Sequence, residues 1–195
     1  MDKPLRIAIA EDEPELLIDL EETLLEFGHE VVVKAKNGAE LVDRCREAAP
    51  DLIITDIKMP DMDGLEAASR IRAIRPTPVV IVSAYHDQEF IDRALKEHVL
   101  AYLVKPLSDQ SLKTSIALAM QRFKEFEALQ KQTADLQQAL EDRKIVERAK
   151  GILMKRAGLS EPDAFRRLQM LSSQKNKKMI EIAQTIVEAD QAFDA

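Results

Sequence analysis

The chain has 195 residues, of which 46% are hydrophobic and 32% are charged, a balance typical of globular rather than disordered proteins. At roughly 100–200 residues per domain, this length allows one domain or two small ones.

No apolar run approaches the ~20 residues that a membrane span needs. Residues 1–6 mix acidic, basic and apolar side chains and do not resemble a signal peptide. The single cysteine, Cys45, excludes a disulfide framework and a cysteine-rich metal site. We therefore expect a cytoplasmic protein with no membrane partner.

Charge is unevenly distributed along the chain. The formal net charge is −7, with a net −10 in residues 1–141 and a net +3 in residues 142–195. The segment 143–178 is the most basic, with 11 basic and 3 acidic residues. An acidic N-terminal body joined to a basic C-terminal segment indicates two functions, the second of which suits a polyanionic partner.

Short apolar strands alternate with amphipathic helices over the first 120 residues. Strands are predicted at 5–10, 31–35, 52–55, 79–83 and 101–104, with a helix at 14–27, closed by Gly28, and further helices ending near residues 48, 75 and 97. The strands are almost continuously apolar, as expected for a sheet covered on both faces. The pattern predicts an α/β fold with a five-stranded, parallel, doubly wound sheet, whose functional crevice lies beyond the carboxyl ends of the strands.

Residues 108–157 contain no proline and one glycine, which predicts a single long helix or a helix with a hinge. Residues at 3-4-3-4 spacing form a short heptad seam that consists of Phe126, Leu129, Thr133, Leu136 and Leu140. The seam suits contact with a second copy of the chain, and the alternative is that the helix packs back on its own N-terminal domain.

Two shorter helices follow the long one. A capped start at Ser160 begins a helix to about residue 171, a polar loop is predicted at 172–176, and a last helix at 178–188. The expected domains are 1–121, a helical linker over 122–141, and a small three-helix domain over 142–195.

Polar side chains follow four of the predicted strands. Glu11 and Asp12 follow the first strand, Asp56 and Ser83 end the third and fourth, and Lys105 follows the fifth. The carboxyl ends of parallel strands meet at one edge, so these side chains should share a pocket. Clustered carboxylates suit Mg²⁺, and a lysine with a hydroxyl suits the oxygens of a phosphoryl group. The pocket therefore predicts a carboxylate that accepts a phosphoryl group by nucleophilic attack. The alternative is a solvated acidic rim.

Residues 5–120 resemble the receiver domain of two-component response regulators, which has a flavodoxin-like fold. The resemblance lies in Ala10–Glu13, Thr55–Gly64, Val82–Ala84 and Ala101–Pro106. It implies that Asp56 is phosphorylated by a sensor histidine kinase, and that Glu11, Asp12, Asp56 and the Lys58 carbonyl hold Mg²⁺. It further implies that Ser83 and Lys105 bind the phosphoryl oxygens, that Tyr102 is the switch aromatic, and that the Lys105–Pro106 bond is cis.

Residues 135–190 resemble the ANTAR domain, a three-helix RNA-binding module of transcription antiterminators. The resemblance lies in residues 143–154, 160–169 and 177–183, and it implies that a dimer binds paired stem-loops in nascent RNA. The candidate RNA-binding residues are Lys144, Arg148, Ala149, Lys150, Gly151, Lys155, Arg166 and Arg167. The alternative is that these charges form an ordinary solvated helix face.

Together the two resemblances predict a phosphorylation-controlled response regulator that binds stem-loop RNA, regulates transcription antitermination and forms a homodimer when phosphorylated. It is not expected to be an enzyme, because any phosphoryl turnover would be self-directed. One alternative is an adaptor whose helical tail docks a protein partner. Another is a DNA-binding regulator, which is disfavoured because no short helix-turn-helix pair follows the receiver-like segment.

Overall fold

The computed structural model describes residues 3–84, 92–93 and 99–193, and the chain divides into two compact units, Met1–Glu127 and Ala128–Ala195. The first unit contains the strands β1 (Arg6–Ala10), β2 (Glu30–Ala35), β3 (Leu52–Thr55), β4 (Val79–Ser83) and β5 (Ala101–Val104). All neighbouring strands are parallel, in the order β2-β1-β3-β4-β5. The predicted five-stranded parallel α/β fold is confirmed.

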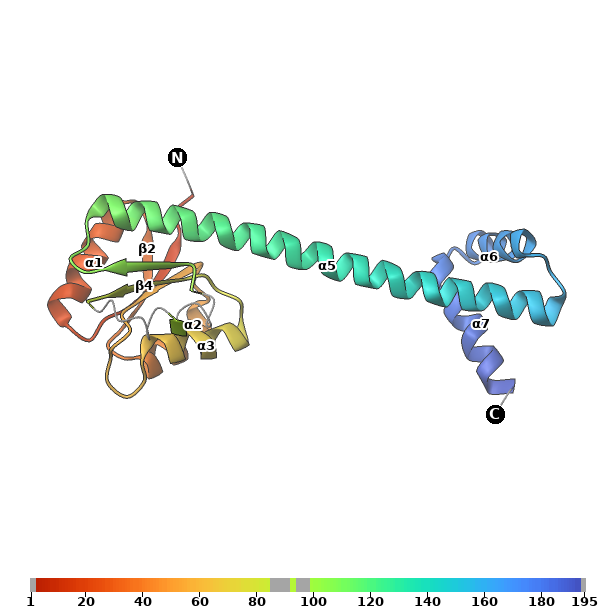
Figure 1. Ribbon diagram of the computed structural model, residues 1–195, viewed down its shortest axis with the longest axis horizontal. Coiled ribbons are helices and arrows are strands. Elements are labelled where there is room, and N and C mark those ends of the chain that lie inside the picture. Colours follow the sequence, from red (N-terminus) through yellow and green to blue (C-terminus); the bar gives the residue numbers. More distant parts are fainter. Residues whose placement is uncertain (1–2, 85–91, 94–98, 194–195) are drawn as a thin grey trace. The chain divides into compact units, whose positions relative to one another are not determined.

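Helices cover both faces of this sheet (Figure 1). On one face, α1 (Pro14–Glu26) and the start of α5 (Asp109–Ala157) bury a core that includes Leu24 and Leu112. On the other face, α2 (Gly38–Ala48) and α3 (Gly64–Ile74) bury a core around Leu41 and Leu65. The helix predicted to end near residue 97 lies outside the described residues, apart from positions 92–93.

Local signals fix the ends of these helices where the sequence predicts them. Gly28 follows α1 with a left-handed φ of 82°, a conformation that glycine adopts without steric cost. Asn37 caps α2 by accepting a hydrogen bond from the Glu40 N–H at 2.8 Å, and Asp63 caps α3 in the same way through the Glu66 N–H. Such caps satisfy backbone donors that a helix leaves open at its start.

The long helix α5 runs without a break from Asp109 to Ala157, so Gly151 lies inside it and no hinge interrupts it. The heptad seam is exposed in the single chain, where Phe126, Leu129, Leu136 and Leu140 keep between 47% and 64% of their surface in solvent. These four large apolar side chains make the seam an exposed apolar face of the helix. Among the described residues, no helix is both long and apolar enough to cross a bilayer.

The second unit consists of the end of α5 with α6 (Glu161–Lys175) and α7 (Met179–Phe193). Its core contains Ala149, Leu168, Ile182 and Ala183. The predicted capped start is present, because the Ser160 hydroxyl accepts a hydrogen bond from the Asp163 N–H.

Both helices of this unit extend beyond their predicted ends. The polar loop predicted at 172–176 is wrong, because α6 continues to Lys175 and ends where Asn176 takes a left-handed φ of 49°. The Asn176 N–H then closes the helix on carbonyls of its last turn. Helix α7 continues past residue 188 to Phe193, and Asp190 in this extension pairs with Arg156 of α5.

Candidate functional site

The predicted polar residues lie beside one another at the carboxyl edge of the sheet. The Asp56 N–H donates to the Ala10 carbonyl at 2.9 Å, and the Lys105 N–H donates to the Ser83 carbonyl at 2.9 Å. These backbone hydrogen bonds fix the ends of neighbouring strands in register. As a result Glu11, Asp56 and Ser83 are all buried beneath one rim.

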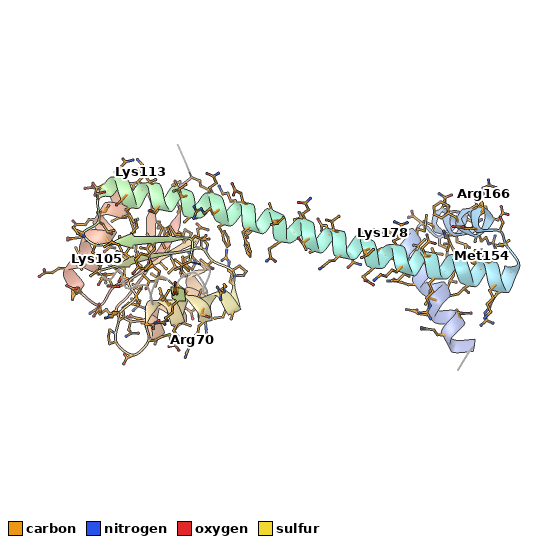
Figure 2. All side chains as sticks on the ribbon, in the orientation of Figure 1. Arg70, Lys105, Lys113, Met154, Arg166 and Lys178 are labelled. Atoms are coloured by element: carbon orange, nitrogen blue, oxygen red, sulfur yellow. The ribbon has the colours of Figure 1, made fainter. Side chains whose placement is uncertain are left out.

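Lys105 joins the two buried carboxylates of the site (Lys105 is labelled in Figure 2). Its ammonium nitrogen lies 2.7 Å from Oε2 of Glu11 and 2.9 Å from Oδ2 of Asp56. Burial alone would lower the pKa of Lys105, but the hydrogen bonds with Glu11 and Asp56 outweigh it and raise this pKa. Burial raises the pKa of the Glu11 carboxyl, although the hydrogen bond with Lys105 opposes this.

A third carboxylate completes an oxygen-rich cluster. Ligand oxygens of Glu11, Asp12 and Asp56 all lie within 4.8 Å of one another. Glu11 Oε1 is buried and has no hydrogen-bond partner among the described residues, whereas Asp12 is exposed at the rim. A buried oxygen without a partner beside two further carboxylates fits a hard cation such as Mg²⁺, which prefers oxygen ligands and keeps several waters.

The backbone after Asp56 orients its carboxylate. Asp56 Oδ1 accepts hydrogen bonds from the N–H groups of Ile57 at 2.5 Å and Lys58 at 3.4 Å. The opposite oxygen, Oδ2, faces Lys105. The loop backbone therefore holds Oδ1 of Asp56, and Oδ2 points to the ammonium group of Lys105.

Gly64 is a site residue that the sequence pattern does not single out, yet the structure needs a glycine there. A Cβ at Gly64 would lie 1.9 Å from the Asp56 carbonyl oxygen and 2.8 Å from Thr55 Oγ1. The Gly64 N–H also donates to the Ile57 carbonyl at 2.9 Å. This close approach folds the loop 56–64 back on the strand end. The only sequence signal was a glycine eight residues after the acceptor, in a loop that also contains a proline.

Two of the remaining predicted residues lie on the last two strands. Ser83 ends β4 and is fully buried. Tyr102, in β5, is half-buried and packs against the core beneath α2 and α3. The Lys105–Pro106 bond is cis, as predicted.

The second unit separates the candidate RNA-binding residues into two groups. Six are exposed: Lys144, Arg148, Gly151, Lys155, Arg166 and Arg167. Ala149 is fully buried in the core of the unit, so it has no surface to offer RNA. The prediction that Ala149 contacts RNA is therefore corrected.

Lys150, a further candidate RNA-binding residue, is corrected as well, because it does not lie on an exposed face. Lys150 keeps only 8% of its surface in solvent, and its ammonium group pairs with Glu147 at 2.9 Å and with Glu161 at 2.8 Å. The side of α5 that carries Lys150 faces the start of α6, which the helical period of α5 alone does not reveal. A signal was present in Glu147, three residues earlier on the same helix.

Comparison with known proteins agrees with this arrangement. Residues 7–117 match the family model of the response regulator receiver domain, and residues 134–187 match that of the ANTAR domain. The chain belongs to the response regulators. Both resemblances found in the sequence are confirmed, and this response regulator is a regulatory protein with a receiver domain and a C-terminal ANTAR domain.

Relatives and solved structures cover different shares of this response regulator. It is 42% identical over 185 residues to the transcriptional regulatory protein PdtaR of Mycobacterium tuberculosis strain H37Rv, covering 95% of this chain and 90% of the relative. A receiver domain protein from Clostridium thermocellum is 31% identical with a TM-score of 0.58, covering 62% of this chain and 98% of the solved one. The signal receiver domain of a modulated diguanylate cyclase from Desulfovibrio desulfuricans G20 is 28% identical with a TM-score of 0.59, covering 63% and 98%.

Proposed function

We propose that Asp56 of this response regulator accepts a phosphoryl group from a sensor histidine kinase. In its phosphorylated form the protein binds stem-loop RNA as a homodimer and regulates transcription antitermination. The observation that carries the proposal is the geometry around Asp56. Its carboxylate is oriented by two backbone N–H groups and faces Lys105 at 2.9 Å. A carboxylate held in this way is a nucleophile with a cation ready for the incoming phosphoryl oxygens.

Magnesium fits the cluster beside Asp56. The carboxylates of Glu11, Asp12 and Asp56, with the Lys58 carbonyl, would hold the ion. When bound, Mg²⁺ offsets the negative charge of these carboxylates and of the phosphoryl group that approaches them. The unpartnered, buried Glu11 Oε1 supports this assignment.

Phosphorylation would change the partners of Lys105. The new group adds roughly −1.5 to −2 charges and strong acceptor oxygens, so Lys105 would turn from Glu11 toward the phosphoryl oxygens. Ser83 would bind another of these oxygens, and Tyr102 would move with it. A rearrangement of this kind biases a receiver surface between two states.

The output step rests on the second unit and on the seam. Exposed cations on α5 and α6 suit an RNA backbone, and the exposed seam of α5 suits a second copy of the chain. The similarity to the transcriptional regulatory protein PdtaR extends over both domains, which supports a role in transcription.

RNA selection tests the proposal against its rivals. The full-length protein, with or without acetyl phosphate and Mg²⁺, selects ligands from a pool of tandem hairpins with randomised loops. We expect the phosphorylated parent to enrich specific hairpins, and Asp56→Asn to bind the selected RNA more weakly under the same conditions. A parallel selection offers a pool of duplex DNA, and enrichment from that pool instead would support a DNA-binding regulator. Failure to enrich either nucleic acid would support the adaptor.

A further inference from the structure

Among the residues that the structure describes, no contact requires a glycine at position 151. It lies inside the unbroken helix α5, where glycine is less favourable than every residue except proline. Apart from its chain neighbours and the backbone of the surrounding helix turns, a Cβ built at this position meets no atom of the described residues within 4 Å, and the φ of Gly151 is not in the left-handed region. An alanine would therefore fit without strain and would stabilise the helix. No contact among the described residues therefore accounts for a glycine at this position.

Two free cations flank Gly151 on the same helix face. Arg148 lies three residues before it and Lys155 four residues after it, which places all three on adjacent turns. All three are exposed. In the part of the chain that the structure describes, neither cation has an ion pair or a hydrogen bond. We call these three residues, Arg148, Gly151 and Lys155, the α5 strip. Met154, which follows Gly151 by three residues, is labelled in Figure 2 and marks this part of α5.

The acidic residue next to the strip is already neutralised. Glu147 lies beside Arg148 in sequence, and Lys150 holds its carboxylate at 2.9 Å. Lys150 also holds Glu161, at 2.8 Å. The buried lysine thus binds the carboxylates near the strip, so Arg148 and Lys155 are left to attract an external anion.

We propose that Gly151 is where the sugar–phosphate backbone of the bound RNA lies against α5, with Arg148 and Lys155 contacting phosphates on either side. The inference rests on the proposed RNA-binding function and adds the contact point. The two cations are seven residues apart, roughly 10 Å along the helix axis, which leaves room for a backbone segment between them. The missing side chain allows that segment to approach the helix closely.

Charge favours RNA over a second copy of the chain at this position. A symmetric contact between two α5 strips would bring Arg148 and Lys155 of one copy close to the same residues of the other, and like charges repel. A polyanion is instead attracted to the strip, and its release of counterions adds to the affinity.

The test uses the full-length protein and the tandem hairpin RNA that the phosphorylated parent selects. We expect Gly151→Ala to raise the thermal unfolding midpoint by a few degrees and to weaken RNA binding at least tenfold, with Gly151→Leu weaker still. The matched control is Ser173→Ala, which adds helix propensity at an exposed position of α6 and should leave the affinity unchanged. Arg148→Gln with Lys155→Gln should lower the slope of log affinity against log salt by about 0.7–0.9 for each lost phosphate contact.

Each outcome separates this inference from the function on which it rests. If the parent selects no RNA, the proposed function fails. If the parent binds RNA and Gly151→Ala binds it equally well, only the contact at Gly151 is refuted. If Gly151→Ala loses affinity only at concentrations where its dimer dissociates in sedimentation, the strip contacts a second copy and the RNA contact is overturned.

Discussion

The ammonium nitrogen of Lys105 lies 2.9 Å from Oδ2 of Asp56, although 49 residues separate the two in sequence. The same nitrogen lies 2.7 Å from Glu11 Oε2. Two buried carboxylates therefore share one cation, and a phosphoryl group on Asp56 would compete with both for it. If Asp56 is phosphorylated as proposed, this competition would link the modification to movement at the ends of β4 and β5, where Ser83 and Lys105 lie.

Replacing the acceptor should abolish phosphorylation. Asp56→Asn keeps the shape of the side chain, but an amide cannot form an acyl phosphate, so we expect no acid-labile label from radioactive acetyl phosphate. Asp61→Asn makes the same change at an exposed position of the same loop and should label like the parent. Undiminished labelling of Asp56→Asn at one other aspartate would remove Asp56 from this role.

Removing magnesium should stop labelling, because the carboxylate cluster repels an anionic phosphoryl donor unless a cation lies within it. Asp12→Ala should reproduce the effect of chelation without unfolding the domain, since Asp12 is exposed. Glu13→Ala is the control, because Glu13 is also exposed and its side chain does not cap α1. Full labelling in excess chelator would contradict the metal site.

Charging the seam should weaken self-association. Leu136→Lys with Leu140→Lys places two cations in the apolar heptad seam. Sedimentation under phosphorylating conditions should then show more monomer than for the parent. Ala134→Lys with Gln138→Lys adds the same charge at the same spacing on the opposite face of α5, and should leave the dimer intact. If both double variants sediment like the parent, the seam is not the dimer contact.

The sheet and its pocket could be predicted because their determinants are local. Short apolar runs in the sequence predict the strands. In any parallel sheet of this strand order, the carboxyl ends of the strands bring Asp56 and Lys105 together. The surroundings of Lys150 could not be predicted from helical period. Whether a lysine at the margin of an apolar face meets water or Glu161 depends on how α6 packs. The end of α6 was missed because Asn176, not glycine, supplies its left-handed residue.

The Cys45 thiol should be inert while the protein is folded. Burial raises its pKa to about 12, so the thiolate needed for reaction is scarce. We expect no reaction with a disulfide reagent at about pH 8 until a denaturant is added, whereas an exposed thiol introduced by Ser173→Cys should react at once. Because the folded pKa lies above the ordinary value of 9.0, the neutral thiol stabilises the fold below about pH 9. That contribution is lost as pH rises toward 12.

Removing the charge of Lys150 should destabilise the second unit. Lys150→Gln leaves Glu147 and Glu161 without their cation, and the thermal unfolding midpoint should fall by a few degrees. Lys144→Gln is the matched control on the same helix. Lys144 is exposed, and its partner among the described residues is the exposed Glu141, so its loss should change the midpoint little, as for most surface ion pairs.

The pH dependence of this difference has a defined sign. The hydrogen bond from Lys150 lowers the pKa of Glu161 from 4.5, so its contribution is present above about pH 4.5 and is lost as pH falls through the lowered pKa. The hydrogen bonds to Glu161 and Glu147 raise the pKa of Lys150 from 10.5, so the lysine contributes fully below that pH and loses its effect as pH rises through the raised pKa. The difference in thermal unfolding midpoint between the parent and Lys150→Gln should therefore be largest near neutral pH and should disappear at acidic pH. If Lys150→Gln is as stable as the parent but binds RNA weakly, the lysine contacts RNA rather than bridging α5 and α6.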